Sequence, residues 1–160
     1  MKQVSTLFLK IAVILIGIPI LALCIFLVPE LGDIAAKLLP EFAYIKYLVS
    51  IIFYASAIPF YAALYQAFKL LRYIDKNEAF SQASVNALKK IKYCAVTISS
   101  LHVLVLPLFY LFAEIDDAPG VIFIGLLVPF ASMVIAVFAA VLQKLLQEAI
   151  DIKSENDLTV

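Results

Sequence analysis

Four long apolar stretches without a charged side chain constrain this chain more than any other feature. Each holds between 19 and 26 residues, and they are Ile11–Pro29, Tyr47–Phe68, Tyr93–Ala113 and Ala118–Gln143. A hydrocarbon core about 30 Å thick requires roughly 20 apolar residues in a helix. Because lipid offers no hydrogen-bond partner to backbone N–H and C=O groups, a segment that crosses it must be helical. The sequence therefore predicts a membrane protein with four transmembrane helices.

The composition leaves little room for a second domain. Hydrophobic residues make up 65% of the chain and the mean hydropathy is +1.07, whereas soluble domains are about 45–50% apolar. We expect a single all-α integral membrane domain, a four-helix transmembrane bundle with spans at about 7–28, 47–68, 93–113 and 120–142. An amphipathic tail at 143–160 follows the last span.

The basic residues are unevenly distributed among the connecting segments. Ten of the 12 Lys and Arg residues precede the first span, separate spans two and three, or follow span four. The other two connectors carry only Lys37 and Lys46 and are otherwise acidic. The positive-inside rule therefore predicts that both termini and the central connector face the cytoplasm.

The central connector is predicted to be a helical hairpin that extends from the membrane into the cytoplasm. Ser81 is a suitable N-cap for its second helix, because its hydroxyl can accept a backbone N–H bond. Val85, Leu88 and Ile91 then form an apolar stripe at helical spacing. The connector at 29–46 has helical spacing too, and both a short surface helix and an ordinary loop are compatible with it.

After span four, apolar residues at the spacing of an amphipathic helix continue through Ile152. Turn-forming residues from Ser154 onward predict that the helix ends there, before a strand-like terminus at Val160.

Polar side chains inside the spans are the candidates for an intramembrane site. Span two carries five tyrosines on one helix face, at positions 44, 47, 54, 61 and 65. Since buried hydroxyls need partners, we expect this stripe to face other helices.

His102 is the only histidine, and Ser99 lies one turn away. An ionisable group in a membrane is a functional-site hypothesis, and the alternative is a neutral imidazole bonded to Ser99, a tyrosine or a carbonyl. The candidate cluster consists of Tyr54, Tyr61, Ser99 and His102.

Two further patterns concern helix shape and packing. Every span contains a proline, at positions 19, 59, 107 and 129, which indicates either static bends or hinges. In span four, Ser132, Ala136 and Ala140 repeat the small-residue spacing that permits close helix approach, within the chain or in a homo-oligomer.

Motifs that would support catalysis or cofactor binding are missing from the sequence. It contains no HExxH, CxxC, GxGxxG or P-loop motif. We therefore expect no enzymatic activity, no cofactor, no metal site and no direct binding of nucleic acid.

Two short segments resemble a known family. The turn Asn77–Ser81 with the helix Val85–Lys92, and the closing Glu155–Val160, resemble the YoaS-like family of small bacterial membrane proteins, a family of unknown function. Ala79 stands where that family usually has proline. The resemblance implies a four-span protein of the bacterial inner membrane. It also implies a neighbouring gene for a small helix-turn-helix regulator of the Cro type.

These observations lead to an interaction hypothesis with a transport alternative. In the first, a cytoplasmic platform holds a soluble partner, such as the small DNA-binding regulator, through Phe80, Ser81, Val85, Leu88, Ile91, Asp157, Leu158 and Val160. The same apolar seam can instead pack the hairpin and tail together. In the alternative, the chain is a small-molecule transporter or channel subunit with a path lined by tyrosine and histidine.

Overall fold

The fold is all-helical throughout the part of the chain that the structure describes. A computed structural model describes residues 2–158, with side chains from residue 4 onward. Within that range the elements are α1 Lys2–Leu38, the short 3-10 helix η1 Pro40–Phe42, α2 Ile45–Asp75, α3 Gln82–Ile115 and α4 Gly120–Leu158. The four α-helices are each long and apolar enough to cross a membrane. The predicted all-α fold with four spanning helices is confirmed.

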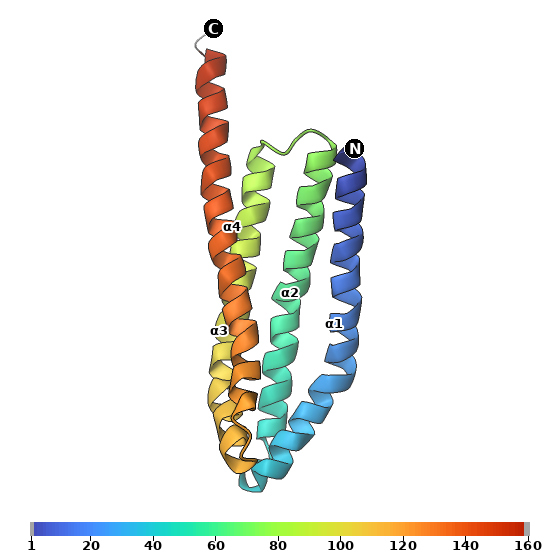
Figure 1. Cartoon of the computed structure of the whole chain (residues 1–160), viewed down its shortest axis with the longest axis vertical. Helices are drawn as coiled ribbons and strands as arrows, with labels where there is room; N and C mark the ends of the chain where they lie inside the picture. The colour runs from blue at the N-terminus through green and yellow to red at the C-terminus, as the bar shows by residue number, and fades with distance from the viewer. Residues whose placement is uncertain (1, 159–160) are drawn as a thin grey trace.

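All four helices are longer than a bilayer requires. They contain between 31 and 39 residues, whereas roughly 20 cross the hydrocarbon core. The start of α1, the α2–α3 turn and the end of α4 are directed toward the same end of the molecule, which we call the lysine-rich end (Figure 1). The α1–α2 and α3–α4 connections form the opposite, acidic end. Much of the surplus length of α4 projects at the lysine-rich end, beyond the other helices (Figure 1).

The first helix does not end at the predicted boundary near residue 28. It continues through Pro29 to Leu38, so the segment after span one is helical but continuous with that span. Pro19 and Pro29 each remove one backbone hydrogen bond, which favours bending. The second half of α1 is bent, and its last turns run beneath α2 (Figure 1).

The bent end of α1 contributes to the hydrophobic core at the acidic end. Ala35 is completely buried there and clusters with Val49 of α2 and with Val105 and Leu108 of α3. The approach is close, because a Cβ atom at Gly32 would lie 3.2 Å from the Lys46 carbonyl oxygen. The end of α1 therefore packs with both α2 and α3 at the acidic end.

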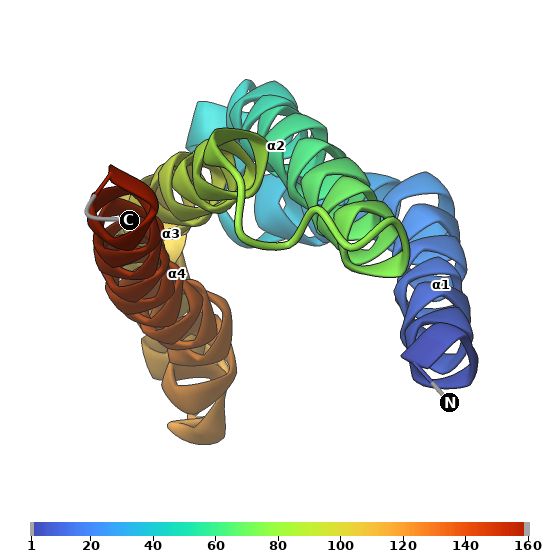
Figure 2. The ribbon, with the colours of Figure 1, turned by 90° about the horizontal axis from the view of Figure 1, so that it is seen from above.

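The four helices lie side by side in an open arc. Packing runs between consecutive helices, from α1 to α2, α2 to α3 and α3 to α4, and α1 and α4 occupy the two ends of the arc (Figure 2). Large apolar side chains such as Phe8, Ile58 and Phe130 are exposed along it. In a membrane these faces contact lipid, which is as apolar as they are.

Candidate functional site

Two tyrosines of α2 bind backbone carbonyls of α1. The Tyr61 hydroxyl donates to the Gly17 carbonyl oxygen at 2.7 Å, and the Tyr54 hydroxyl donates to the Cys24 carbonyl oxygen at 3.0 Å. The two tyrosines are seven residues apart on α2, and their two acceptors are seven residues apart on α1. This equal spacing is expected for two antiparallel helices in constant register. These hydroxyls therefore connect α1 to α2 at two levels.

The remaining tyrosines of the stripe do not face other helices. Tyr44, Tyr47 and Tyr65 are exposed, so the prediction that the whole stripe would face other helices is wrong for them. Tyr54 is 43% exposed although its hydroxyl reaches α1. Tyr65 lies near the lysine-rich end with the Lys69 ammonium 5.7 Å from its ring centroid. Exposed tyrosines near both ends of a span are typical of the aromatic belts at membrane surfaces.

His102 bonds across the α2–α3 contact. Its Nε2 atom lies 3.2 Å from the Ser56 hydroxyl oxygen, and both side chains are buried. Ser56 donates its own proton to the Phe53 carbonyl oxygen at 2.8 Å. Since a hydroxyl has one proton, Ser56 accepts from His102, which places the histidine proton on Nε2. The rings of Phe53 and His102 are also in T-shaped contact, with 5.2 Å between their centroids.

Ser99 bonds in another direction, toward α4. Its hydroxyl donates to the Pro129 carbonyl oxygen at 3.1 Å. Tyr54 and Tyr61 therefore serve the α1–α2 contact, His102 the α2–α3 contact and Ser99 the α3–α4 contact. The hydrogen bonds of these four residues therefore do not join them into one cluster, and the path of the transport alternative stays a prediction.

The small residues of span four pack inside the chain. Gly125, Ser132 and Ala136 are buried on the face of α4 that contacts α3. The approach is closest at Gly125, where an added Cβ atom would lie 2.8 Å from Cγ of Phe109. The face predicted for close helix approach is therefore occupied by α3.

The turn at the lysine-rich end confirms the predicted cap. The Ser81 hydroxyl accepts from the Ser84 backbone N–H at 3.3 Å and donates to the Glu78 carbonyl oxygen at 2.6 Å. Asn77 adopts a left-handed backbone with φ of 59°, a conformation that asparagine tolerates well. Phe80 remains 64% exposed in this turn.

A charged contact joins α1 to the end of α2. The Lys10 ammonium binds one carboxylate oxygen of Asp75, and the buried Thr6 hydroxyl donates to the other. The Lys10 nitrogen also lies 5.6 Å from the Phe68 ring centroid. This contact stabilises the α1–α2 pair where it reaches the lysine-rich end.

The apolar seam of the hairpin is buried within the chain. Val85 is 3% exposed, Leu88 is 7% exposed and Ile91 is half-buried. They follow the helical spacing that was predicted, and in this conformation they contact the rest of the chain. Their burial indicates packing within the chain, whereas residues 151–158 of the tail, which the alternative would pack against the hairpin, are exposed.

The tail is helical where a turn was predicted. The helix α4 continues through Ser154 to Leu158, so the expected end of the helix is wrong, and Val160 lies outside the described residues. Every residue from 151 to 158 is exposed, including Asp157, and Leu158 is 83% exposed. A local bond lies at its start, from the Gln147 amide to the Asp151 carboxylate at 3.0 Å.

An ion pair marks the acidic end, outside the expected spans 7–28 and 47–68. The Lys46 ammonium lies 2.7 Å from the Asp33 carboxylate. A hydrogen bond and the charge of Lys46 lower the pKa of Asp33, and the same interactions with Asp33 raise the pKa of Lys46. Because the pair is exposed, solvent weakens it, and we assign it a local structural role.

These contacts connect neighbouring helices. Within residues 2–158, no group of three or more His, Cys, Asp or Glu side chains is arranged to hold a metal ion. The polar groups inside the spans bond one another or a backbone carbonyl. Fold and contacts together define a multi-pass integral membrane protein with four spanning helices.

Comparison with known proteins gives the family. The chain belongs to the family described as Protein of unknown function (DUF2975), which matches residues 30–160. It is 73% identical over 160 residues to the uncharacterized membrane protein YoaS of Bacillus subtilis (strain 168), and the match covers 100% of both chains. These findings confirm the resemblance to the YoaS-like family. No solved structure matches the chain.

Proposed function

We propose that this protein is a regulatory interaction protein, not an enzyme, and that its lysine-rich end holds a soluble partner in the cytoplasm. The observation that carries this proposal is the projecting end of α4, residues 151–158, in which every side chain is exposed. A partner candidate is the small helix-turn-helix regulator that the family resemblance implies. The distribution of lysine and arginine supports a cytoplasmic location for this end.

The projecting segment gains little from the rest of the chain. At about 1.5 Å per residue, its eight residues extend roughly 12 Å. The segment continues α4 as a helix, yet none of its described side chains is buried. A partner that packs against Ile152 and Leu158 would supply the missing contacts.

The charge of the segment favours a basic partner. It contains Asp151, Glu155 and Asp157 against the single Lys153. DNA-binding regulators present a basic surface to phosphate, and an acidic helix is complementary to such a surface. Docking on the segment would compete with DNA and keep the regulator at the membrane.

The experiment compares the full chain with a chain that ends at Ile150. Each is produced together with a small helix-turn-helix regulator of the kind that the family resemblance implies, then solubilised and purified through a tag at the N-terminus. We expect the truncated chain to insert in the membrane normally and to lose the regulator. The control is Ser154→Ala, which changes the same segment while leaving Ile152, Leu158 and all three acidic residues in place. Retention of the regulator by the truncated chain, or loss of it with Ser154→Ala, would contradict the proposal.

A further inference from the structure

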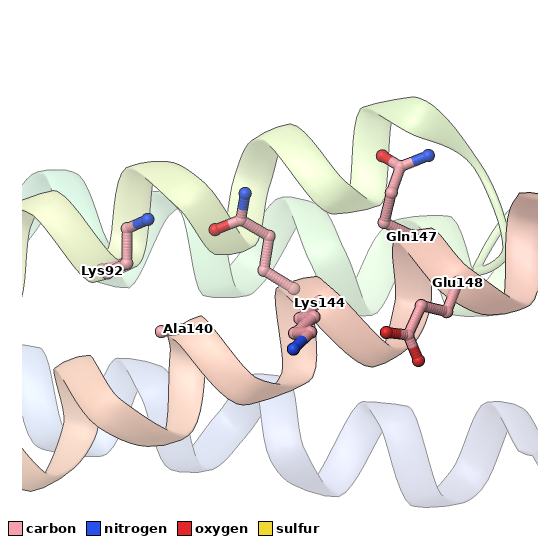
Figure 3. A pocket seen from close by; sticks show the side chains of 6 residues that line it. Lys92, Ala140, Lys144, Gln147 and Glu148 are labelled. Carbon is pink, nitrogen blue, oxygen red and sulfur yellow. The ribbon is translucent and has the colours of Figure 1, made fainter.

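An open groove lies between α3 and α4 at the lysine-rich end. It measures about 380 Å³ and is lined by Lys92 of α3 and by Ala140, Gln143, Lys144, Gln147 and Glu148 of α4. Figure 3 shows Lys92 projecting from α3, across the groove from the side chains of α4. The groove lies where the expected spans three and four reach the membrane surface.

The groove has the chemistry of an anion site. Lys92 and Lys144 contribute two ammonium groups, and the two glutamines contribute amide N–H donors. Among the described residues the ion pairs involve Lys10 and Lys46, so neither lysine of the groove is neutralised by a carboxylate. With Glu148 included, the formal charge of the lining is +1.

A second, apolar groove lies on the surface of α4 alone, about one helical turn deeper in the membrane than Ala140. It measures about 280 Å³ and is lined by Phe130, Met133, Val134, Val137 and Phe138, all within the expected span four. Met133, Val137, Ala140 and Lys144 follow one another at spacings of four, three and four, which places them along one helix face. Val137 lies about 10 Å deeper than Lys144 along the helix axis.

We propose that the two grooves together bind one anionic phosphoglycerolipid, of which phosphatidylglycerol is the simplest example. The phosphate lies between Lys92 and Lys144, and an acyl chain follows Val137 and Met133. Basic pockets between spanning helices are suited to anionic headgroups. A net charge of +1 favours a lipid that carries −1 over a zwitterionic one, while Glu148 can accept hydrogen bonds from the headgroup glycerol. The proposal depends neither on a soluble partner nor on which side of the membrane the lysine-rich end faces.

The test is a binding titration of the full chain in detergent micelles, read by native mass spectrometry. The groove variant carries Lys92→Gln and Lys144→Gln, and the control carries Lys89→Gln and Lys153→Gln, which removes the same charge from exposed positions of the same end. We expect the groove variant to bind phosphatidylglycerol about thirty-fold more weakly, from the contribution typical of two lysines near a membrane surface. The control should change by less than about twofold, and Lys92→Arg with Lys144→Arg should retain binding.

Three results would overturn the proposal. Equal weakening in the groove variant and the control would show diffuse attraction to the whole lysine-rich end. Binding of phosphatidylethanolamine or phosphatidylcholine as tight as that of phosphatidylglycerol would show that charge does not select the lipid. Displacement of the lipid by an equal concentration of inorganic phosphate would show a site for free anions. Circular dichroism of every variant must match the unmodified chain, so that weak binding is not a consequence of unfolding.

Discussion

Replacing Gly125 by alanine tests the close approach of α4 to Phe109 of α3. The added Cβ would lie 2.8 Å from Cγ and 3.1 Å from Cβ of Phe109, whereas carbon atoms in favourable contact are about 3.5–4.0 Å apart. Because the Phe109 Cβ is held by its own backbone, the ring stem cannot move aside, and α3 and α4 must separate. Overpacking of this kind costs about 1–3 kcal/mol. Alanine in place of glycine offsets about 1 kcal/mol through helix propensity, which leaves a net destabilisation of up to about 2 kcal/mol.

A matched glycine provides the control for this substitution. Gly120 is the first residue of α4, and an added Cβ there would meet nothing within 4 Å. Gly120→Ala should therefore leave the free energy of unfolding unchanged or raise it by up to about 1 kcal/mol. Equilibrium unfolding in mixed micelles, followed by circular dichroism as the fraction of sodium dodecyl sulfate increases, measures both variants under the same conditions.

A second substitution identifies the cause of any loss at Gly125. In a Phe109→Ala background the ring atoms are absent and only the Phe109 Cβ contact at 3.1 Å remains, so Gly125→Ala should then cost less than it does in the unmodified chain. If Gly125→Ala and Gly120→Ala have equal effects, or if Phe109→Ala gives no relief, the described contact between α3 and α4 is wrong.

Two other contacts give predictions of smaller size. Tyr61→Phe removes the hydrogen bond to the Gly17 carbonyl. It should lower the free energy of unfolding by about 0.6 kcal/mol, the average for such bonds in membranes. The control Tyr47→Phe, at an exposed ring, should have no effect in the same unfolding assay. At the acidic end, the lowered pKa of Asp33 means that its bond to Lys46 stabilises the fold above the ordinary pKa of 3.8 and is lost as the pH falls through the lower folded value. The small difference in thermal stability between the unmodified chain and Asp33→Asn should therefore be constant from pH 5 to pH 8, vanish in acid and shrink in high salt.

Helix number and the α3 cap were predictable because the physics behind them is local. A run of apolar residues long enough to span a bilayer must be helical wherever its neighbours lie. Ser81 caps α3 through atoms within six residues of it in the chain. Such features can be read without knowledge of the tertiary packing.

Helix ends were less predictable, because an existing helix extends easily. Adding a residue to a helix forms one more backbone bond at little cost, so Ser154 and its polar neighbours do not stop α4. Pro29 removes one bond of α1, and the packing of Ala35 at the acidic end compensates for it. The turn preference of polar residues opposes the stabilisation gained by extending or packing a helix. The sequence does not reveal which of these two free energies is larger.

Contacts across helices were the least predictable. The spacing of the tyrosines correctly places Tyr54 and Tyr61 on one face of α2, but it does not say which helix that face meets. His102 bonds to Ser56 rather than to Ser99, which lies one turn away on its own helix. Partner choice depends on the register between helices, and one sequence contains no direct signal for that register.

The orientation of the lysine-rich end is tested most directly by thiol labelling of intact cells. Both native cysteines, Cys24 and Cys94, are first replaced by alanine, and a single cysteine is then introduced at Glu78 or at Asp116. These exposed positions lie in the connections at opposite ends of the molecule. With a maleimide that cannot cross membranes, Asp116→Cys should be labelled on intact cells and Glu78→Cys only after the membrane is permeabilised. Labelling of Glu78→Cys on intact cells, with protection of Asp116→Cys, would place the lysine-rich end outside and contradict a cytoplasmic docking function.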